Sequence, residues 1–241
     1  MSRHFELLKE VDRKFASSVV RQRGEAEPVE LRRLKSKVGP RTSEALHQLV
    51  HRLFLADGNS RCVLFTGAAS GVGCTWVVVH SAEALCAETT ASVCLVEVGT
   101  NSSWIRQHFQ VPNDQRWEVI IEDKPLHTLV RKVGGNLWVL PGANTEADDA
   151  MSSQQRLEAS LLLLRQEFEY VLLDMSSATR GSRVRPGTLV DGAVLVLKAG
   201  HTPRPAVKRA VDDLESTGIK VLGTVLNQRE YPIPASVYKR L

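Results

Sequence analysis

The sequence lacks long hydrophobic runs and has few aromatic residues, which make up 5% of its 241 residues. Its mean hydropathy is -0.14. No apolar stretch approaches the roughly 20 residues that a membrane-spanning helix needs. No apolar signal core follows the first methionine. We therefore expect a cytoplasmic protein with no segment inside a bilayer.

Cysteine is also scarce, and its spacing excludes the common cysteine-based metal sites. The four cysteines are Cys62, Cys74, Cys86 and Cys94, and none of them forms a CxxC pair. No cluster of cysteine and histidine has the spacing of a zinc site. Cys62 and Cys94 lie in apolar runs and are typical of small core residues. We expect four reduced thiols and no metal site made by cysteine.

Positive charge is concentrated at the start of the chain. The sequence has 31 Lys and Arg against 27 Asp and Glu, and residues 1–42 hold 11 of the basic and 6 of the acidic residues. Residues 5–19 have helical apolar spacing, and residues 23–41 read as a charged linker. We predict a basic N-terminal helix and linker over residues 1–40, and one folded domain over residues 41–241. Such an arm could meet anionic lipid, nucleic acid or an acidic partner, or simply be solvated.

Within the folded domain, short apolar runs alternate with segments of helical periodicity. This pattern is typical of an α/β fold with a mainly parallel sheet and helices on both faces. Ligands bind such sheets beyond the carboxyl ends of the strands. The predicted strands are residues 61–65, 92–98, 137–140, 170–174, 193–198 and 220–226. The predicted helical segments are residues 43–54, 74–87, 103–109, 117–133, 152–168 and 205–215.

A loop of small residues, 66–75, follows the first predicted strand and opens a helix. In such a loop, backbone N–H groups can converge on phosphate oxygens, and the helix N-terminus adds positive potential. The standard pattern is GxxxxGK[ST]. Only Gly73 and Thr75 match it, because Ala68 stands at the first glycine and Cys74 at the lysine. The candidate nucleotide contacts are Ala69, Ser70, Gly71, Val72, Gly73, Cys74 and Thr75.

Two predicted strands end on carboxylates, Glu97 and Asp174, which are the candidate catalytic residues. Thr75 and Asp174 are the candidate ligands of Mg²⁺, directly or through water. Simpler interpretations stay open: Asp174 could cap nearby N–H groups, and Glu97 could be a solvated or ion-paired acid. Cys74 could be a plain small side chain or a thiol acidified by the helix N-terminus.

The order of these parts resembles the bacterial tyrosine kinases, the cytoplasmic modules of exopolysaccharide and capsule co-polymerases. It also resembles their relatives, the deviant P-loop ATPases that partition plasmids and position division sites. The resemblance covers about residues 41–241. The matching parts are a first helix at residues 43–55, the loop at 66–75, a second strand at 93–97, a Walker B strand at 170–174 and a closing segment at 191–227.

The resemblance implies a P-loop NTPase-like fold that binds ATP or ADP with Mg²⁺. It places Asn227 against adenine and makes Tyr231 and Tyr238 the candidate phosphoacceptors. The implied partners are a membrane polysaccharide co-polymerase or its cytoplasmic tail, and further copies of the chain. A basic N-terminus would allow contact with the inner membrane surface. Nucleic acid is not expected, because Ala69 and Cys74 replace both lysines of the partition class.

The departures from the family pattern fall on residues that carry its chemistry. Cys74 replaces the lysine that holds the β- and γ-phosphates, while Glu97, Gly99 and Asn101 replace the two aspartates and the arginine of the second motif. Phosphoryl transfer depends on positive charge and metal around the transferred group. We therefore expect a degenerate kinase-like protein, with weak or no ATP turnover, that regulates or scaffolds a co-polymerase. An active tyrosine autokinase and a partition-type ATPase are the alternatives.

Overall fold

The computed structural model describes residues 38–56, 60–98, 104–111, 130–142, 150–175 and 186–229. None of the helices described there is long and apolar enough to cross a membrane. The helical elements are α2 (Pro40–Val50), the π-helical turn η1 (His51–Leu55), α3 (Cys74–Glu88), α4 (Trp104–Phe109), α5 (Ala150–Glu167), the 3-10 turn η4 (Gly187–Leu189) and α6 (Arg204–Glu215). The strands are β1 (Cys62–Gly67), β2 (Val93–Glu97), β3 (Arg131–Gly134), β4 (Leu137–Leu140), β5 (Tyr170–Met175), β6 (Gly192–Lys198) and β7 (Val221–Asn227).

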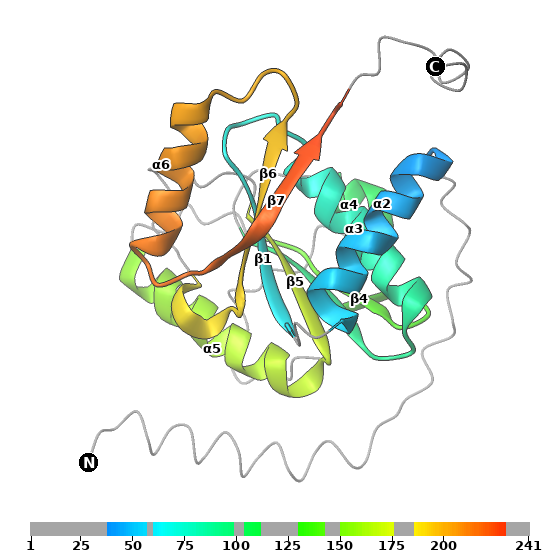
Figure 1. Cartoon of the computed structure of the whole chain (residues 1–241). Coiled ribbons are helices and arrows are strands. Elements are labelled where there is room, and N and C mark those ends of the chain that lie inside the picture. Colours follow the sequence, from blue (N-terminus) through cyan, green and yellow to red (C-terminus); the bar gives the residue numbers. More distant parts are fainter. Residues whose placement is uncertain are drawn as a thin grey trace, which may run out of the picture. The chain divides into compact units, whose positions relative to one another are not determined.

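The strands form one seven-stranded sheet in the order β3-β4-β2-β5-β1-β6-β7 (Figure 1). Every neighbouring pair is parallel except β3 and β4. The carboxyl ends of β1, β5, β2 and β6 therefore meet at one edge of the sheet. The predicted α/β fold with a mainly parallel sheet is confirmed.

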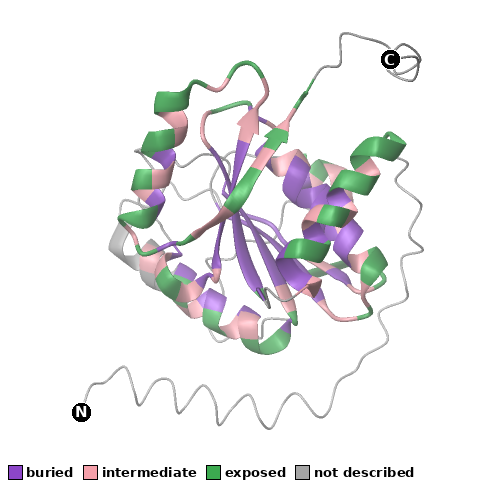
Figure 2. Ribbon diagram, viewed as in Figure 1, coloured by how far each residue is buried: buried purple, intermediate pink, exposed green. Residues whose placement is uncertain are grey.

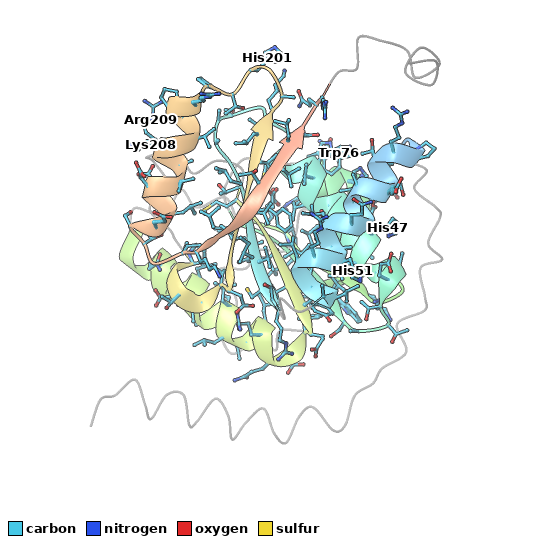
Figure 3. The ribbon with its side chains drawn as sticks, viewed as in Figure 1. His47, His51, Trp76, His201, Lys208 and Arg209 are labelled. Atoms are coloured by element: carbon cyan, nitrogen blue, oxygen red, sulfur yellow. The ribbon has the colours of Figure 1, made fainter. Side chains whose placement is uncertain are left out.

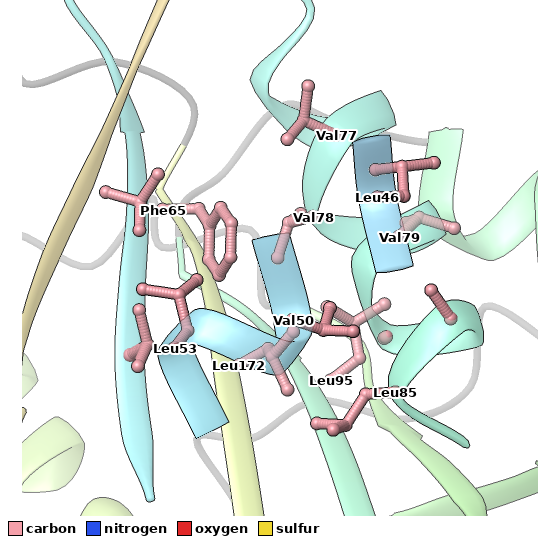
Figure 4. Packing of buried hydrophobic residues seen from close by; sticks show 14 of the residues in the cluster. Leu46, Val50, Leu53, Phe65, Val77, Val78, Val79, Leu85, Leu95 and Leu172 are labelled. Carbon is pink, nitrogen blue, oxygen red and sulfur yellow. The ribbon is translucent and has the colours of Figure 1, made fainter. Parts of the chain in front are cut away.

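Helices cover both faces of this sheet, as the continuous apolar runs predicted. All residues of β1 and β2 are buried, and Figure 2 shows the central strands buried between exposed helical surfaces. On one face, Val50 of α2 and Val78 of α3 pack against Phe65 of β1 (Figure 4). On the other face, Leu161 of α5 and Leu214 near the end of α6 belong to a second buried cluster. The loop between β1 and α3 is thus held between a rigid strand and a packed helix.

The prediction of helical pieces over residues 117–133 is wrong at its end. Residues Arg131–Gly134 form β3, which pairs antiparallel with β4. The two strands are joined through Gly135, whose φ of 39 is in the left-handed region, and Asn136. The Asn136 amide donates to the carbonyls of Thr89 and Ala91, at 2.9 and 2.6 Å. The tight turn through Gly135, held in place by the hydrogen bonds of Asn136, therefore favours a hairpin here.

The first described helix begins at Pro40, three residues before the predicted start at residue 43. Gly39 is the N-cap, and its carbonyl accepts hydrogen bonds from the N–H groups of Thr42 and Ser43 at 2.9 and 3.0 Å. Pro40 occupies the first turn, where its fixed φ suits a helix and its missing N–H costs nothing. The prediction for residues 1–40 otherwise lies outside the described residues.

Candidate functional site

The loop between β1 and α3 turns through two glycines in the left-handed region. Gly71 has a φ of 74 and Gly73, the N-cap of α3, has a φ of 81. A Cβ added at Gly73 would lie 2.4 Å from Nδ2 of Asn227, so both conformation and space require glycine there. The loop that the sequence predicted is therefore present, and its last glycine touches the end of β7.

Strands β6 and β7 fasten the loop from the side. The N–H of Ala68 donates to the Val196 carbonyl at 3.0 Å. The Asn227 amide donates to the Val72 carbonyl at 2.9 Å, and the Gln228 amide lies 3.5 Å from the Gly71 carbonyl. Asn227, predicted as an adenine contact, thus lies at the loop, where its Nδ2 is bonded to the loop backbone.

The amide N–H groups of this loop are available to a ligand. Those of residues 69–73 donate to no other residue in the described part of the chain, and the first helical bond of α3 runs from the N–H of Val77 to the carbonyl of Gly73. Successive unbonded N–H groups at the start of a 15-residue helix form a site for an anion. A second, independent feature beside them, the Asp174 carboxylate, also indicates a ligand.

Asp174 lies at the carboxyl end of β5, next to Phe65 of β1 in register. It is 2% exposed, and its Oδ1 has no hydrogen-bond partner among the described residues. Burial raises the pKa of Asp174 to about 6, although hydrogen bonds from the side chains of Thr75 and Cys74 lower it in part. A buried carboxylate oxygen without a partner is costly unless a ligand uses it.

Cys74 occupies the lysine position at the first residue of α3 and is 4% exposed. Burial raises the pKa of its thiol well above the ordinary value, and the neighbouring Asp174 raises it further. The side chain is therefore a neutral thiol. The alternative of an acidified, reactive cysteine is wrong, because burial and the neighbouring carboxylate both favour the neutral thiol.

Glu97 ends β2 in register with Asp174, so the two predicted carboxylates are neighbours at the same edge. Glu97 is 4% exposed, and its Oε2 accepts a hydrogen bond from the N–H of Gly142 at 3.0 Å. The guanidinium of Arg106 donates to the carbonyl of the same Gly142. These contacts tie β2 to the segment that follows β4, which gives Glu97 a structural role at this edge.

A Mg²⁺ ion fits part of this donor set. The Thr75 hydroxyl and the Asp174 carboxylate would hold it, because both are oxygen ligands and Oδ1 of Asp174 lacks another partner in the described structure. When bound, the metal would supply positive charge beside the loop. Tyr231, Tyr238, Gly99 and Asn101 lie outside the described residues.

Sequence reasoning placed no functional weight on Lys198, the last residue of β6. The structure sets it in register with Asn227, beside the loop. The indication in the sequence was a basic residue at the carboxyl end of an otherwise apolar strand, the edge at which parallel sheets bind ligands.

No family model and no curated protein matches this chain. The kinase domain of Escherichia coli tyrosine kinase ETK is similar in structure, with a TM-score of 0.66 and 18% identity over 80% of this chain and 78% of that chain. The chimerical protein CapA2B2 has a TM-score of 0.71 and 17% identity, over 82% of this chain and 88% of that chain. The chain has a P-loop NTPase fold. The septum site-determining protein MinD from Pyrococcus horikoshii, complexed with Mg-ADP, is also similar. Its TM-score is 0.57 and its identity 19%, over 75% of this chain and 76% of that chain.

These neighbours are the two kinds of protein that the sequence motifs resemble. At such low identity the similarity establishes the fold and leaves the activity to the residues of the site. In this chain those residues are a loop with open N–H groups, a buried carboxylate and a neutral thiol in place of a lysine.

Proposed function

We propose that this chain is a degenerate, tyrosine-kinase-like P-loop protein that binds magnesium nucleotide weakly and transfers its phosphate slowly or not at all. Its role would be to regulate or scaffold a membrane polysaccharide co-polymerase. The observation that supports this most is the buried thiol of Cys74 at the first residue of α3, close to Asp174, at the position where the loop pattern has a phosphate-binding lysine.

The missing ammonium has a definite energetic consequence. A charge-assisted hydrogen bond contributes about 1.5–3 kcal/mol, which corresponds to roughly 10- to 100-fold in affinity. The transition state of phosphoryl transfer depends even more on fixed positive charge, because charge develops on the transferred group. The loss of lysine should therefore reduce turnover more than binding.

Weak binding is still expected because three elements of the site remain. Residues 69–73 offer N–H groups to phosphate oxygens, and α3 adds its N-terminal potential. Thr75 and Asp174 together could hold Mg²⁺. The proposed partner follows from the resemblance to the kinases of exopolysaccharide and capsule systems, and the structural similarity to ETK and CapA2B2 supports that comparison.

Calorimetric titration with Mg·ADP tests the binding half of the proposal. Cys74→Lys should tighten binding by about 10- to 100-fold, because it restores the charge-assisted contact. The matched control is Gln48→Lys, which adds the same charge at an exposed position on α2. It should bind like the wild type. Equal affinity of wild type and Cys74→Lys would contradict the proposal.

Incubation with Mg·ATP tests the catalytic half. We expect no phosphotyrosine on Tyr231 or Tyr238 beyond the level in Asp174→Asn. Phosphotyrosine that forms in the wild type and disappears in Asp174→Asn would establish the active autokinase in its place. Thermal melts of each variant show that the comparison is made between folded proteins.

A further inference from the structure

Lys198 and Asn227 end two neighbouring parallel strands in register. Register partners in a sheet direct their side chains to the same face. The face used by Asn227 is known, because its amide donates to the Val72 carbonyl of the loop. The side chain of Lys198 therefore leaves β6 on the face that carries the loop and α3.

The alternation along β6 leads to the same face independently. Val194 and Val196 belong to the buried cluster that includes Phe65 of β1 and Val77 of α3. Lys198 lies two residues beyond Val196, so it shares their side of the sheet. Because the Val196 carbonyl accepts the N–H of Ala68, where the chain leaves β1, Lys198 lies alongside the loop itself.

The backbone of Lys198 is firmly held. Its N–H donates to the Thr202 hydroxyl at 2.8 Å, and its carbonyl accepts the N–H groups of His201 and Thr202 at 3.2 and 3.0 Å. The N–H of Ala199 donates to the Asn227 carbonyl at 2.9 Å. A fixed backbone beside the loop leaves only the flexible four-carbon stem to adjust the position of the ammonium.

The charge of Lys198 is not used by a described acid. Within the part of the chain that the structure describes, Lys198 forms no ion pair, although its side chain is half-buried. The basic residues Lys208 and Arg209 lie exposed on the outer side of α6 (Figure 3). Among the lysines of the described residues, Lys198 is therefore the one that shares the face and the edge of the loop.

We infer that Lys198 is a ligand-binding residue whose ammonium contacts a phosphate group of a nucleoside diphosphate seated on the loop. It compensates in part for the charge that Cys74 lacks. This inference rests on the proposed nucleotide binding. In the sheet, β1 lies between β5, which carries Asp174, and β6, which carries Lys198. The inference therefore places the cation and the carboxylate of the site on opposite sides of β1.

The test is calorimetric titration with Mg·ADP of the wild type, Lys198→Met and Lys198→Arg. Lys198→Met should weaken binding about tenfold or more and reduce its dependence on salt, because one charged contact is lost. Lys198→Arg should keep most of the affinity, because it keeps the charge. Lys198→Met keeps most of the apolar stem, so a purely structural role of the stem would leave its affinity unchanged. Lys220→Met is the matched control, since Lys220 is exposed just before β7, at the opposite end of the sheet. It should bind like the wild type.

The same substitution in the Cys74→Lys background separates the possible failures. There Lys198→Met should have a smaller effect, because the restored lysine supplies the charge. If the wild type binds Mg·ADP and Lys198→Met binds equally well, this inference is overturned while the proposed function stands. If the wild type does not bind Mg·ADP at millimolar concentration and Cys74→Lys does, both the weak binding and the role of Lys198 are overturned.

Discussion

Two carboxylates at opposite ends of the sheet show how differently this fold treats a buried or half-buried acid. At the amino end, Asp191 accepts hydrogen bonds from the N–H groups of Arg61 and Cys62 at 2.6 and 2.7 Å, and from the guanidinium of Arg165 at 3.0 Å. These contacts hold the pKa of Asp191 below its usual range, although burial opposes them. At the carboxyl end, Asp174 has one oxygen without a described partner and a pKa raised to about 6.

The difference separates stability from function. A carboxylate that is satisfied by the fold stabilises it, whereas a carboxylate left partly unsatisfied destabilises the empty protein and is available to a ligand. Proteins tolerate such local conflicts at their functional sites. Our proposal therefore assigns the binding site to the carboxyl end of this sheet, although Cys74 stands at the lysine position.

The largest expected effect on stability comes from removing the Asp191 carboxylate at the amino end of the sheet. Asp191→Ala should lower the free energy of unfolding by about 3 kcal/mol, because it leaves two backbone N–H groups and a guanidinium without their acceptor. Urea denaturation measures this effect. Asp212→Ala, on the exposed side of α6, is the control and should change stability by less than about 0.5 kcal/mol. A similarly small change for Asp191→Ala would show that the hydrogen bonds of Asp191 do not stabilise the fold.

At the carboxyl end of the sheet, we expect removal of a carboxylate charge to raise the free energy of unfolding. Asp174→Asn should raise the free energy of unfolding by about 1–2 kcal/mol at pH 8 in a metal chelator, because it removes a buried charge. The pKa of Asp174 is raised in the folded state, so its ionisation destabilises the protein above about pH 6. That penalty disappears as the pH falls towards the unfolded pKa near 3.8, and the advantage of the variant should shrink with it. A destabilised Asp174→Asn at pH 8 would show that the carboxylate is structural.

A smaller effect is expected at a third carboxylate, Glu83, whose hydrogen bonds join α3 to α4. Glu83 of α3 accepts hydrogen bonds from His80 at 2.6 Å and from His108 of α4 at 3.0 Å. Although burial raises it, these bonds lower the pKa of Glu83 to about 2. Glu83→Gln should cost about 1 kcal/mol and increase hydrogen exchange in α4 more than in α5. Unchanged exchange in α4 would show that Glu83 does not hold the two helices together.

Local patterns predicted every described strand except β3, the loop and both strand-end carboxylates, because each depends on neighbouring residues. They did not predict that Glu97 would accept the N–H of Gly142, which lies 45 residues away at the end of another strand. Nor did they predict β3, since Arg131 and Lys132 are exposed on an edge strand and give no apolar alternation. Contacts between residues this far apart in the sequence decide which groups each carboxylate meets.

The most direct test of the account is the rate of phosphate release from Mg·ATP by the wild type, Cys74→Lys and Asp174→Asn. The account predicts that the wild type turns over no faster than Asp174→Asn, because a neutral thiol cannot stabilise the charge that develops on the transferred phosphate. Metal-dependent turnover by the wild type at about 1 s⁻¹ or more, the range of working kinases, would contradict it.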